Sequence, residues 1–474
     1  LLAMLNSMLF ADIKVDKNVP QKTSVDRAQN GANIININTP NNKGISVNDF
    51  SEFRTKDPTV FNNFGQGVGR SYLAGMMAAN PNLTKEQAAR LILNRVGGNN
   101  RVEIENWLEV MSENKTDIIF SSQNGFYLNN TGFINFDKAI FTTSRVDLDG
   151  NGDLLPFNIR GGKIEIGREG INAEGVRYLA LLSRQMYIDG QIYAKDADID
   201  LIAGDFDYNP HTRDYTKQGV SNNELLISSS AFGSIYGNQI KIVGVNGNIG
   251  VAGDVISERV LKINADGTIV TNKTQAKEAM EIKAKEFVQE GSVYTEGKLT
   301  IEADKTILKG SGTQASEIEI SGNLDNNSNL HSTGNVTVEK DVKNKGQMIS
   351  ENSLDIKGSL DSDNLVYGKN EIRVGKSLVN KSDIQSEGNI TVSEETINTG
   401  RILSDKELNI KGNTVNQGTL YGKDNIRIEK NLNNTGSVQT TGELRAKDTV
   451  NTGKLTVEGN ISTENLDNSG EIVT

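Results

Sequence analysis

Apolar residues recur at fixed positions of an 18-residue repeat in the last third of the chain. Seven units follow one another without a gap from Gly322 to Lys447. The fifteenth and seventeenth positions of each unit are apolar and the residue between them is polar, as in Val336-Thr337-Val338. This alternation with period two predicts β-strands, because a helix would repeat its apolar residues three and four positions apart.

The length of the repeat predicts a β-solenoid. Eighteen residues at ~3.3 Å per residue give a path of roughly 60 Å, enough for one three-sided coil. Upstream, Ile301 follows Ile282 by 19 residues, so residues 261–321 are expected to form less regular coils. Within them, Gln275–Glu286 has an alternative interpretation as a helix, since Ala, Lys and Glu are strong helix formers.

Residues 322–474 are expected to form a shaft of such coils. Beyond Lys447 the pattern continues irregularly, and Asn465–Gly470 repeats the motif of Asn431–Gly436. A solenoid needs a polar cap, because an open last coil exposes strand edges and core. No cap is visible in the sequence, so we expect the shaft to continue in a longer, C-terminally truncated protein.

The fifth position of the repeat is Asn in six of the seven units: Asn326, Asn344, Asn380, Asn398, Asn416 and Asn434. The fifth position, like the apolar positions, is odd-numbered, and alternate residues of a strand point to the same side. These amides are therefore expected to point inward near a corner. Stacked amides hydrogen-bond from coil to coil, which predicts an asparagine ladder. The alternative is that they are turn asparagines facing water.

Residues 1–11 are mostly apolar and end on Ala11, before the polar run Asp12–Lys17. This pattern is typical of a signal-peptide remnant. An amphipathic N-terminal helix is the alternative. No run of about 20 apolar residues is present that would span a membrane as a helix.

Composition narrows the possible functions. The chain of 474 residues has no Cys, two His and a net charge of −11. Disulfides and Cys-based metal sites are therefore excluded, and a His-based metal or Ser–His catalytic centre is disfavoured. An acidic chain also argues against nucleic-acid binding. Aromatic residues make up only 5%, which favours a core of stacked aliphatic side chains.

The region before the repeats is strand-rich but irregular, and several motifs occur in order along it: Asn33–Asn38, Gly44–Phe50, Asn80–Leu83, Gln123–Leu128, Gly161–Ile164 and Ser230–Tyr236. Roughly residues 20–255 resemble the N-terminal haemagglutination-activity or secretion domain of filamentous-haemagglutinin-type exoproteins, the passengers of two-partner secretion. We assign this domain to residues 12–260. The resemblance implies a right-handed parallel β-helix, and the repeat spacings give it about 18–20 residues per coil. It also implies a partner, an outer-membrane β-barrel transporter that recognises the domain in the periplasm.

Two turn motifs of that family have counterparts here. One is intact as Asn80, Pro81, Asn82 and Leu83. The other, usually Asn-Pro-Asn-Gly-Ile, is represented by Ser122–Phe126 with Asn124 and Gly125 retained and the Pro absent. The resemblance implies that they serve folding and export. Turn chemistry alone also explains these residue types, so direct transporter contact and a purely structural role both stay open.

The segment Thr84–Val96 has the local pattern of a capped helix. Family members are extended at the matching place, with Leu91, Leu93 and Val96 packing inward. We therefore expect a strand here.

Two acidic clusters are candidate functional sites. Asp147, Asp149, Asn151 and Asp153 resemble the start of a calcium loop, but position 12 is Asn158 instead of Glu, so a solvated turn is favoured. Asp196, Asp198 and Asp200 alternate with apolar residues, and are expected on the solvated outside of a strand with no Lys or Arg cluster beside them. No catalytic residue, metal or cofactor is therefore predicted.

These observations predict a non-enzymatic, secreted or surface-displayed adhesin-like protein of a Gram-negative bacterium. Its export would pass through the periplasm and the partner transporter, and its receptor would be a cell-surface glycan or protein. One alternative is the N-terminal part of a contact-dependent growth-inhibition toxin. A β-helix polysaccharide lyase is the other.

Overall fold

The computed structural model describes residues 12–474, so the predicted signal remnant lies outside the described residues. Every regular element in the described part is a β-strand, and no helix there could cross a membrane. The chain divides into two compact units at Gly267/Thr268. Each unit is a parallel β-solenoid, which confirms the fold class expected from the repeats.

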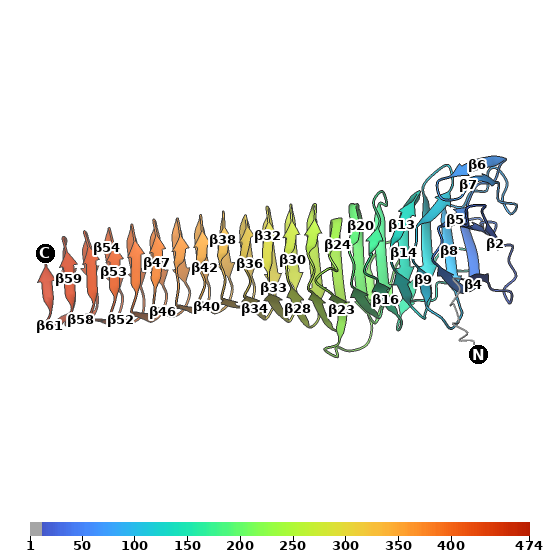
Figure 1. Ribbon diagram of the computed structural model, residues 1–474. Helices are drawn as coiled ribbons and strands as arrows, with labels where there is room; N and C mark the ends of the chain where they lie inside the picture. Colours follow the sequence, from blue (N-terminus) through green and yellow to red (C-terminus); the bar gives the residue numbers. More distant parts are fainter. Residues whose placement is uncertain (1–11) are drawn as a thin grey trace, which may run out of the picture. The chain divides into compact units, whose positions relative to one another are not determined.

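The second unit, residues 268–474, has three short strands per coil. Each strand pairs in parallel with the strand three places further along the chain, giving three columns. They run from β28 (Thr268–Thr271) to β61 (Asn465–Asn468), from β29 (Thr274–Ala276) to β62 (Glu471–Val473), and from β30 (Ala279–Lys283) to β60 (Ile461–Ser462). Figure 1 shows these strands as successive arrows from yellow to red.

The paired residues give the length of each coil. Leu324 pairs with Val342, and Ile426 pairs with Leu444, so the spacing of 18 predicted from the sequence is confirmed between these positions. The next coil is shorter, because Leu432 pairs with Thr449 instead of the residue 18 positions on. The pattern beyond Lys447 is thus a regular spacing of 17, where irregular coils were expected.

Upstream coils of the second unit are slightly longer. Ile282 pairs with Ile301, as their sequence spacing predicts. The alternative of a helix over Gln275–Glu286 is wrong, because β30 crosses that segment with Met280 and Ile282 buried. Alternating burial outweighs helix propensity here, since each inward side chain packs against its counterparts on neighbouring coils.

The first unit also has three parallel columns, and some long strands turn a corner and serve two of them. The first column consists of β3 (Asn33–Asn36), β5 (Thr59–Asn62), β10 (Leu108–Met111), β13 (Thr131–Ile134), β17 (Ile171–Asn172), β20 (Ile192–Gly204), β24 (Ile235–Val245) and β26 (Val255–Ser257). The second consists of β4 (Ile45–Thr55), β8 (Leu91–Val96), β11 (Thr116–Ser121), β14 (Phe136–Thr142), β18 (Tyr178–Ser183), the later parts of β20 and β24, and β27 (Val260–Ala265). The third consists of the end of β4, β9 (Val102–Ile104), β12 (Phe126–Leu128), β16 (Lys163–Ile166), β19 (Gln185–Ile188), β23 (Leu225–Ser229) and β25 (Asn248–Val251).

Antiparallel strands cover the N-terminal end of the first unit. β1 (Ile13–Val15) pairs with β4, and β2 (Ser24–Arg27) pairs with β3. These strands occupy edges that the first coil would otherwise expose, which is how solenoids avoid pairing with other chains.

Two small antiparallel sheets lie outside the coils of the first unit. One is the hairpin of β6 (Val68–Ser71) and β7 (Gly75–Ala78), and the other joins β15 (Phe157–Ile159), β21 (Phe206–Tyr208) and β22 (Tyr215–Lys217). The second sheet packs on the outer face of the second column, burying Leu93 and Ile119 there. We call it the outer sheet.

Aromatic side chains are concentrated in the first unit. Phe287 is the only one of the chain's 14 Phe residues beyond Gly267. Inside the coils, the ring centroids of Phe53 and Phe120 are 5.2 Å apart, and those of Phe120 and Phe141 are 5.3 Å apart. The expectation of an aliphatic core therefore describes the second unit and is wrong for the first.

Candidate functional site

The turn formed by Asn80–Leu83 lies between β7 and β8 and is fastened by the buried side chain of Asn80. Its Nδ2 donates to the carbonyl oxygens of Ile37 and Asn62, at 2.9 and 2.8 Å. Its Oδ1 accepts from the backbone N–H of Asn82 at 2.9 Å, which shapes the turn locally. Asn80 therefore ties the turn to two strand ends that precede it in the chain.

Asn82 extends this network. Its Nδ2 donates to the carbonyl oxygens of Lys22 and Ile37, at 2.8 and 3.1 Å, and its own carbonyl accepts from Thr39 Oγ1 at 2.8 Å. Leu83 is buried, whereas Pro81 is exposed. The polar groups of this turn are thus used inside the domain, and Pro81 is the member that faces solvent.

The second turn, Ser122–Phe126, precedes β12. Gly125 has φ +91°, and a Cβ there would lie 2.2 Å from the carbonyl oxygen of Lys163 on the next coil. Asn124 Nδ2 donates to the carbonyl of Gly98 on the preceding coil. Gly125 and Asn124 thus let the turn fit closely between two neighbouring coils without the proline. Among residues 12–474, no hydrogen bond joins this turn to Asn80–Leu83.

The segment after the first turn is extended, as the family resemblance implied. Leu91, Leu93 and Val96 lie on β8 and are buried. The expected inward packing is wrong for Leu91 and Leu93, because both lie on the outer face of the strand and are covered by the outer sheet. The helix suggested by local pattern is wrong, because β8 is paired on both sides, with β4 and β11.

The acidic loop of Asp147, Asp149, Asn151 and Asp153 forms a tight turn. Asp149 Oδ1 accepts from the backbone N–H groups of Asn151 and Asp153, at 2.8 and 2.9 Å. These bonds lower the pKa of the Asp149 carboxyl. Asp147 instead lies 3.1 Å from Arg145. In the described part of the chain, no three His, Asp or Glu side chains are grouped as metal ligands.

The aspartates of β20 differ from the expectation. Asp196 is exposed, but Asp200 is only 8% exposed and accepts from Tyr178 Oη at 2.7 Å. The Tyr178 and Tyr208 hydroxyls are 2.8 Å apart, and Tyr208 belongs to the outer sheet. The prediction of a solvated Asp200 is wrong, because a segment distant in sequence covers this face.

Basic groups also lie beside these aspartates, contrary to the sequence prediction. Arg213 lies 3.8 Å from Asp198, and its guanidinium lies 3.8 Å from the centre of the Tyr178 ring. Burial raises the pKa of Asp200 and outweighs the lowering by the hydrogen bond from Tyr178 and by the charges of Lys241 and Arg213. The cluster therefore joins the outer sheet to the coils.

The asparagines of the repeat lie inside the second unit with no exposed surface. Nδ2 of each donates to the equivalent side chain of the next coil. The distances are 2.8 Å from Asn326 to Asn344, from Asn380 to Asn398 and from Asn398 to Asn416, and 2.7 Å from Asn416 to Asn434. The series continues to Asn451 and Asn468. Ser362 stands between Asn344 and Asn380, and accepts from Asn344 at 3.1 Å.

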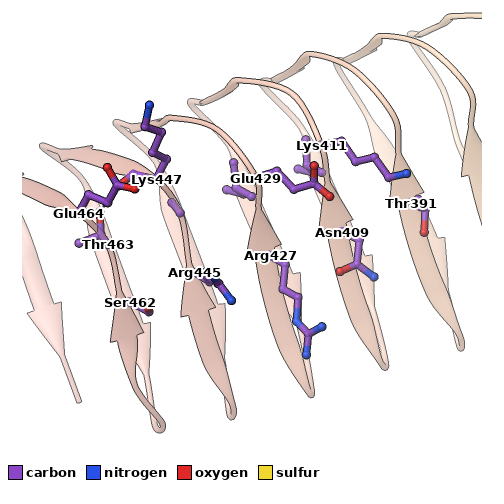
Figure 2. Close-up of a pocket in the computed structure, with 13 residues that line it drawn as sticks. Thr391, Asn409, Lys411, Arg427, Glu429, Arg445, Lys447, Ser462, Thr463 and Glu464 are labelled. Atoms are coloured by element: carbon purple, nitrogen blue, oxygen red, sulfur yellow. Dashed lines mark hydrogen bonds between the residues drawn. The ribbon is translucent and has the colours of Figure 1, made fainter.

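A shallow hollow on the second unit is lined by outward side chains of both signs: Lys411, Arg427, Glu429, Arg445, Lys447 and Glu464 (Figure 2). Arg427 lies 3.4 Å from Glu407. Along one row, Lys411, Glu429, Lys447 and Glu464 alternate in charge from coil to coil, and Arg427 and Arg445 add two further cations beside that row.

Sequence reasoning missed the hairpin of β6 and β7. Its turn is held by the buried carboxylate of Glu109, which accepts from Ser71 Oγ at 2.6 Å and from the backbone N–H groups of Tyr72 and Leu73 at 2.9 and 2.8 Å. The outer sheet was also missed, although Phe157-Asn158-Ile159 and Phe206-Asp207-Tyr208 alternate as strands do.

Comparison with known sequences identifies the first unit. Residues 11–271, more than half of the chain, match the family model of the TPS (two-partner secretion) secretion domain. The chain belongs to the TPS secretion domain family. Exoproteins with a TPS domain are secreted by Gram-negative bacteria and displayed on the cell surface.

The TPS domain also has a structural counterpart. The crystal structure of the filamentous hemagglutinin secretion domain matches with a TM-score of 0.52 and 24% identity, covering 62% of this chain and 99% of that one. This likeness shows the parallel β-helical fold.

Curated relatives of the TPS chain include filamentous hemagglutinin of Bordetella pertussis, 29% identical over 59% of this chain and 8% of that protein. Another is the 16S rRNA endonuclease CdiA of Enterobacter cloacae, 27% identical over 66% of this chain and 9% of that protein. A third is the protein adenylyltransferase and cysteine protease IbpA of Histophilus somni, 28% identical over 64% and 8%. This chain thus spans less than a tenth of these relatives.

Proposed function

We propose that the first unit directs export through a partner outer-membrane β-barrel transporter, and that the second unit is the beginning of an adhesin-like shaft displayed outside the cell. The match of residues 11–271 to the TPS secretion domain carries this proposal. On this proposal the protein crosses the periplasm before it meets the transporter.

The absence of cysteine fits this route, because an unbridged chain can pass a pore unfolded. The folding of the coils then favours outward movement of the chain. Each coil hydrogen-bonds to the one before it, so coils that form outside oppose backward movement of the chain.

Within this function, Asn80–Leu83 is a folding element whose geometry serves export. Its amides are used to close the N-terminal coils, and exposed Pro81 is the group that a transporter would contact. We infer that coil closure is the main role of Asn80 and Asn82. The turn at Asn124 and Gly125 has the same role between later coils.

The experiment is a secretion assay in a Gram-negative host that expresses the chain, with its native signal peptide, and the transporter encoded in the same gene cluster. Deletion of Asn80–Leu83 is expected to abolish the extracellular form. Asn80→Ala is expected to reduce it, while Pro81→Ala tests direct contact separately. Normal secretion of the deletion variant would refute the role of this turn, and secretion that does not depend on the transporter would refute the function.

Asn209 and Pro210 provide a matched control. They form another Asn-Pro turn, in which Asn209 Oδ1 accepts from the backbone N–H of His211 at 2.9 Å. This turn lies between β21 and β22 of the outer sheet. Asn209→Ala is therefore expected to leave secretion unchanged.

A growth-inhibition toxin is the second candidate, because several relatives are named CdiA and match this chain only over its N-terminal scaffold. The sequence of the complete gene product distinguishes the two, since a toxin would carry a nuclease or other toxic domain after the shaft. On either reading, residues 12–474 are proposed to be non-enzymatic. A polysaccharide lyase would instead cleave acidic glycans and lose that activity in the Asp198→Ala variant.

A further inference from the structure

A groove of about 370 Å³ lies on the outer face of the first column of the first unit. Side chains from four coils line it, namely Trp107, Asn130, Glu169, Asn172, Gln191 and Tyr193. None of them belongs to the two asparagine turns or to the outer sheet. We call it the Trp107 groove.

Trp107 forms one end of the groove and is the only tryptophan of the chain. Its indole ring lies across the backbone of Gly132 on the next coil. A Cβ at position 132 would come within 2.3–2.5 Å of three ring atoms, so only glycine permits this placement. One face of the ring is thereby packed on β13, while the side chain stays partly exposed as a flat apolar platform in the groove.

Tyr193 forms the other end. Strand register places Gly132, Asn172 and Tyr193 on three successive rungs, and Tyr236 on the fourth. Neighbouring strands are about 4.8 Å apart, so the indole over Gly132 and the Tyr193 ring are roughly 10 Å apart along the column. The Tyr193 and Tyr236 rings contact each other, with centroids 6.1 Å apart, which fixes the tyrosine platform.

The polar groups between the platforms are available for a ligand. Within residues 12–474, the amide of Gln191, the carboxylate of Glu169 and Nδ2 of Asn172 have no hydrogen-bond partner. Asn172 Oδ1 accepts from the backbone N–H of Glu174 at 3.0 Å, which orients its Nδ2. The groove therefore offers amide donors and acceptors between two aromatic surfaces.

We propose that the Trp107 groove binds a neutral glycan. The C–H face of a sugar ring packs on an aromatic face, while its hydroxyls exchange hydrogen bonds with planar amides and a carboxylate. Glu169 is the only side chain of the lining that carries a charge at neutral pH, and that charge is negative, so an acidic saccharide would be repelled. The length between the platforms suits a short oligosaccharide. This proposal deepens the adhesin function by naming its ligand class, and in that sense rests on it.

The test uses the purified 474-residue chain and the fluorescence of Trp107, which reports on the groove alone. The chain is titrated with neutral oligosaccharides that together contain glucose, galactose, mannose, fucose and the N-acetylhexosamines, and with 3′-sialyllactose. At least one neutral probe is expected to change the emission saturably, and to bind at least tenfold more tightly than its acidic counterpart. No saturable change with any neutral probe would overturn the proposal, as would tighter binding of sialyllactose than lactose.

Variants locate the binding. Tyr193→Ala and Asn172→Ala are each expected to weaken it at least tenfold with an unchanged β circular-dichroism spectrum. Tyr187→Ala is the matched control, because Tyr187 is an exposed tyrosine on β19 in the third column. Undiminished binding in both groove variants would refute the site. Secretion is measured separately: Tyr193→Ala is expected to be exported normally, and failure of export in the unaltered chain would refute the proposed function without changing the titration.

Discussion

Buried polar side chains do more than fill space in the first unit. Asn80, Glu109 and Asp200 each accept or donate hydrogen bonds that join segments 18 or more residues apart. A buried polar group left without partners costs free energy, so such residues fix one arrangement of the chain. Each of these hydrogen bonds depends on one side chain, so its contribution to stability is tested by a single substitution.

Asp200→Asn is expected to make stability less dependent on pH. Burial raises the pKa of Asp200 above its unfolded value, about 3.9, so between these two pKa values the folded protein binds more protons than the unfolded one. Its contribution to stability is then present at low pH and falls as pH rises through this window. Asn does not titrate and still accepts from Tyr178. The variant should therefore gain stability relative to the parent chain as pH rises above about 4, as measured by urea unfolding.

The groups facing Asp200 are Tyr178, Tyr208, Arg213, Lys241 and Asp198, and all are unchanged in that comparison. A stability difference that is flat with pH, or that falls as pH rises, would contradict the prediction.

Asn80→Ala is expected to destabilise the first unit by roughly 2–3 kcal/mol, because it leaves the carbonyls of Ile37 and Asn62 without their donor. The free energy of unfolding in urea measures this loss. Asn209→Ala removes a comparable turn bond at a half-buried position and should cost less than about 1 kcal/mol. Equal losses in the two variants would show that Asn80 acts only as a turn residue.

At the scale of the strands, the sequence predicts strand position and side-chain direction well in those parts of the chain where each side chain has equivalent neighbours. Positions such as Leu354 and Ile372 repeat because the strand above and the strand below offer the same environment. The outer sheet could not be predicted in this way. Its strand β15 pairs with β21 across a gap of about fifty residues, from Phe157 to Tyr208, and no periodicity marks which face the sheet will cover. The buried state of Asp200 follows from that sheet and was missed with it.

The candidate groove shows the same limit. Trp107 and Tyr193 were visible in the sequence, but 86 residues separate them and the coils between them differ in length. Only the strand register brings them to one face. The turn residues Asn80 and Gly125, by contrast, could be selected beforehand, because local conformation restricts the residue types that fit.

Ser362→Asn is expected to stabilise the second unit. Ser362 interrupts the stack between Asn344 and Asn380, and is buried in register with both. An Asn would complete the coil-to-coil bonds seen elsewhere, adding about 1 kcal/mol by the usual net value of a hydrogen bond. The midpoint of urea unfolding should rise accordingly. Asn398→Ser, which creates a second interruption, should lower it, and a lower midpoint for Ser362→Asn would contradict this account of the stack.

At the scale of the molecule, the second unit is an array in which a strand pairs only with the coil before and the coil after. Its stability is then a sum of coil terms and neighbour terms, whereas in the first unit the outer sheet packs across several coils. This organisation explains why the number of domains cannot be estimated from chain length.

Removal of one whole coil should therefore be tolerated. Deletion of residues 376–393 restores every register, because Glu394 then follows Gly375 at the equivalent corner. The variant is expected to keep the parent β circular-dichroism spectrum and resistance to protease. Deletion of residues 376–384, half a coil, moves later strands to the wrong side and should cause loss of both. Similar behaviour of the two deletions would refute the array description.

The stepwise pairing of the second unit also has a mechanical consequence. Tension on the chain loads the outermost coil alone, since deeper coils are joined to the applied force only through it. Unfolding under load would then proceed coil by coil, each event releasing 17 or 18 residues, or roughly 60 Å of extended chain. Such a protein lengthens in small steps and dissipates mechanical work at each step. The peak force on its attachment is therefore lower than the force on a rigid tether under the same extension.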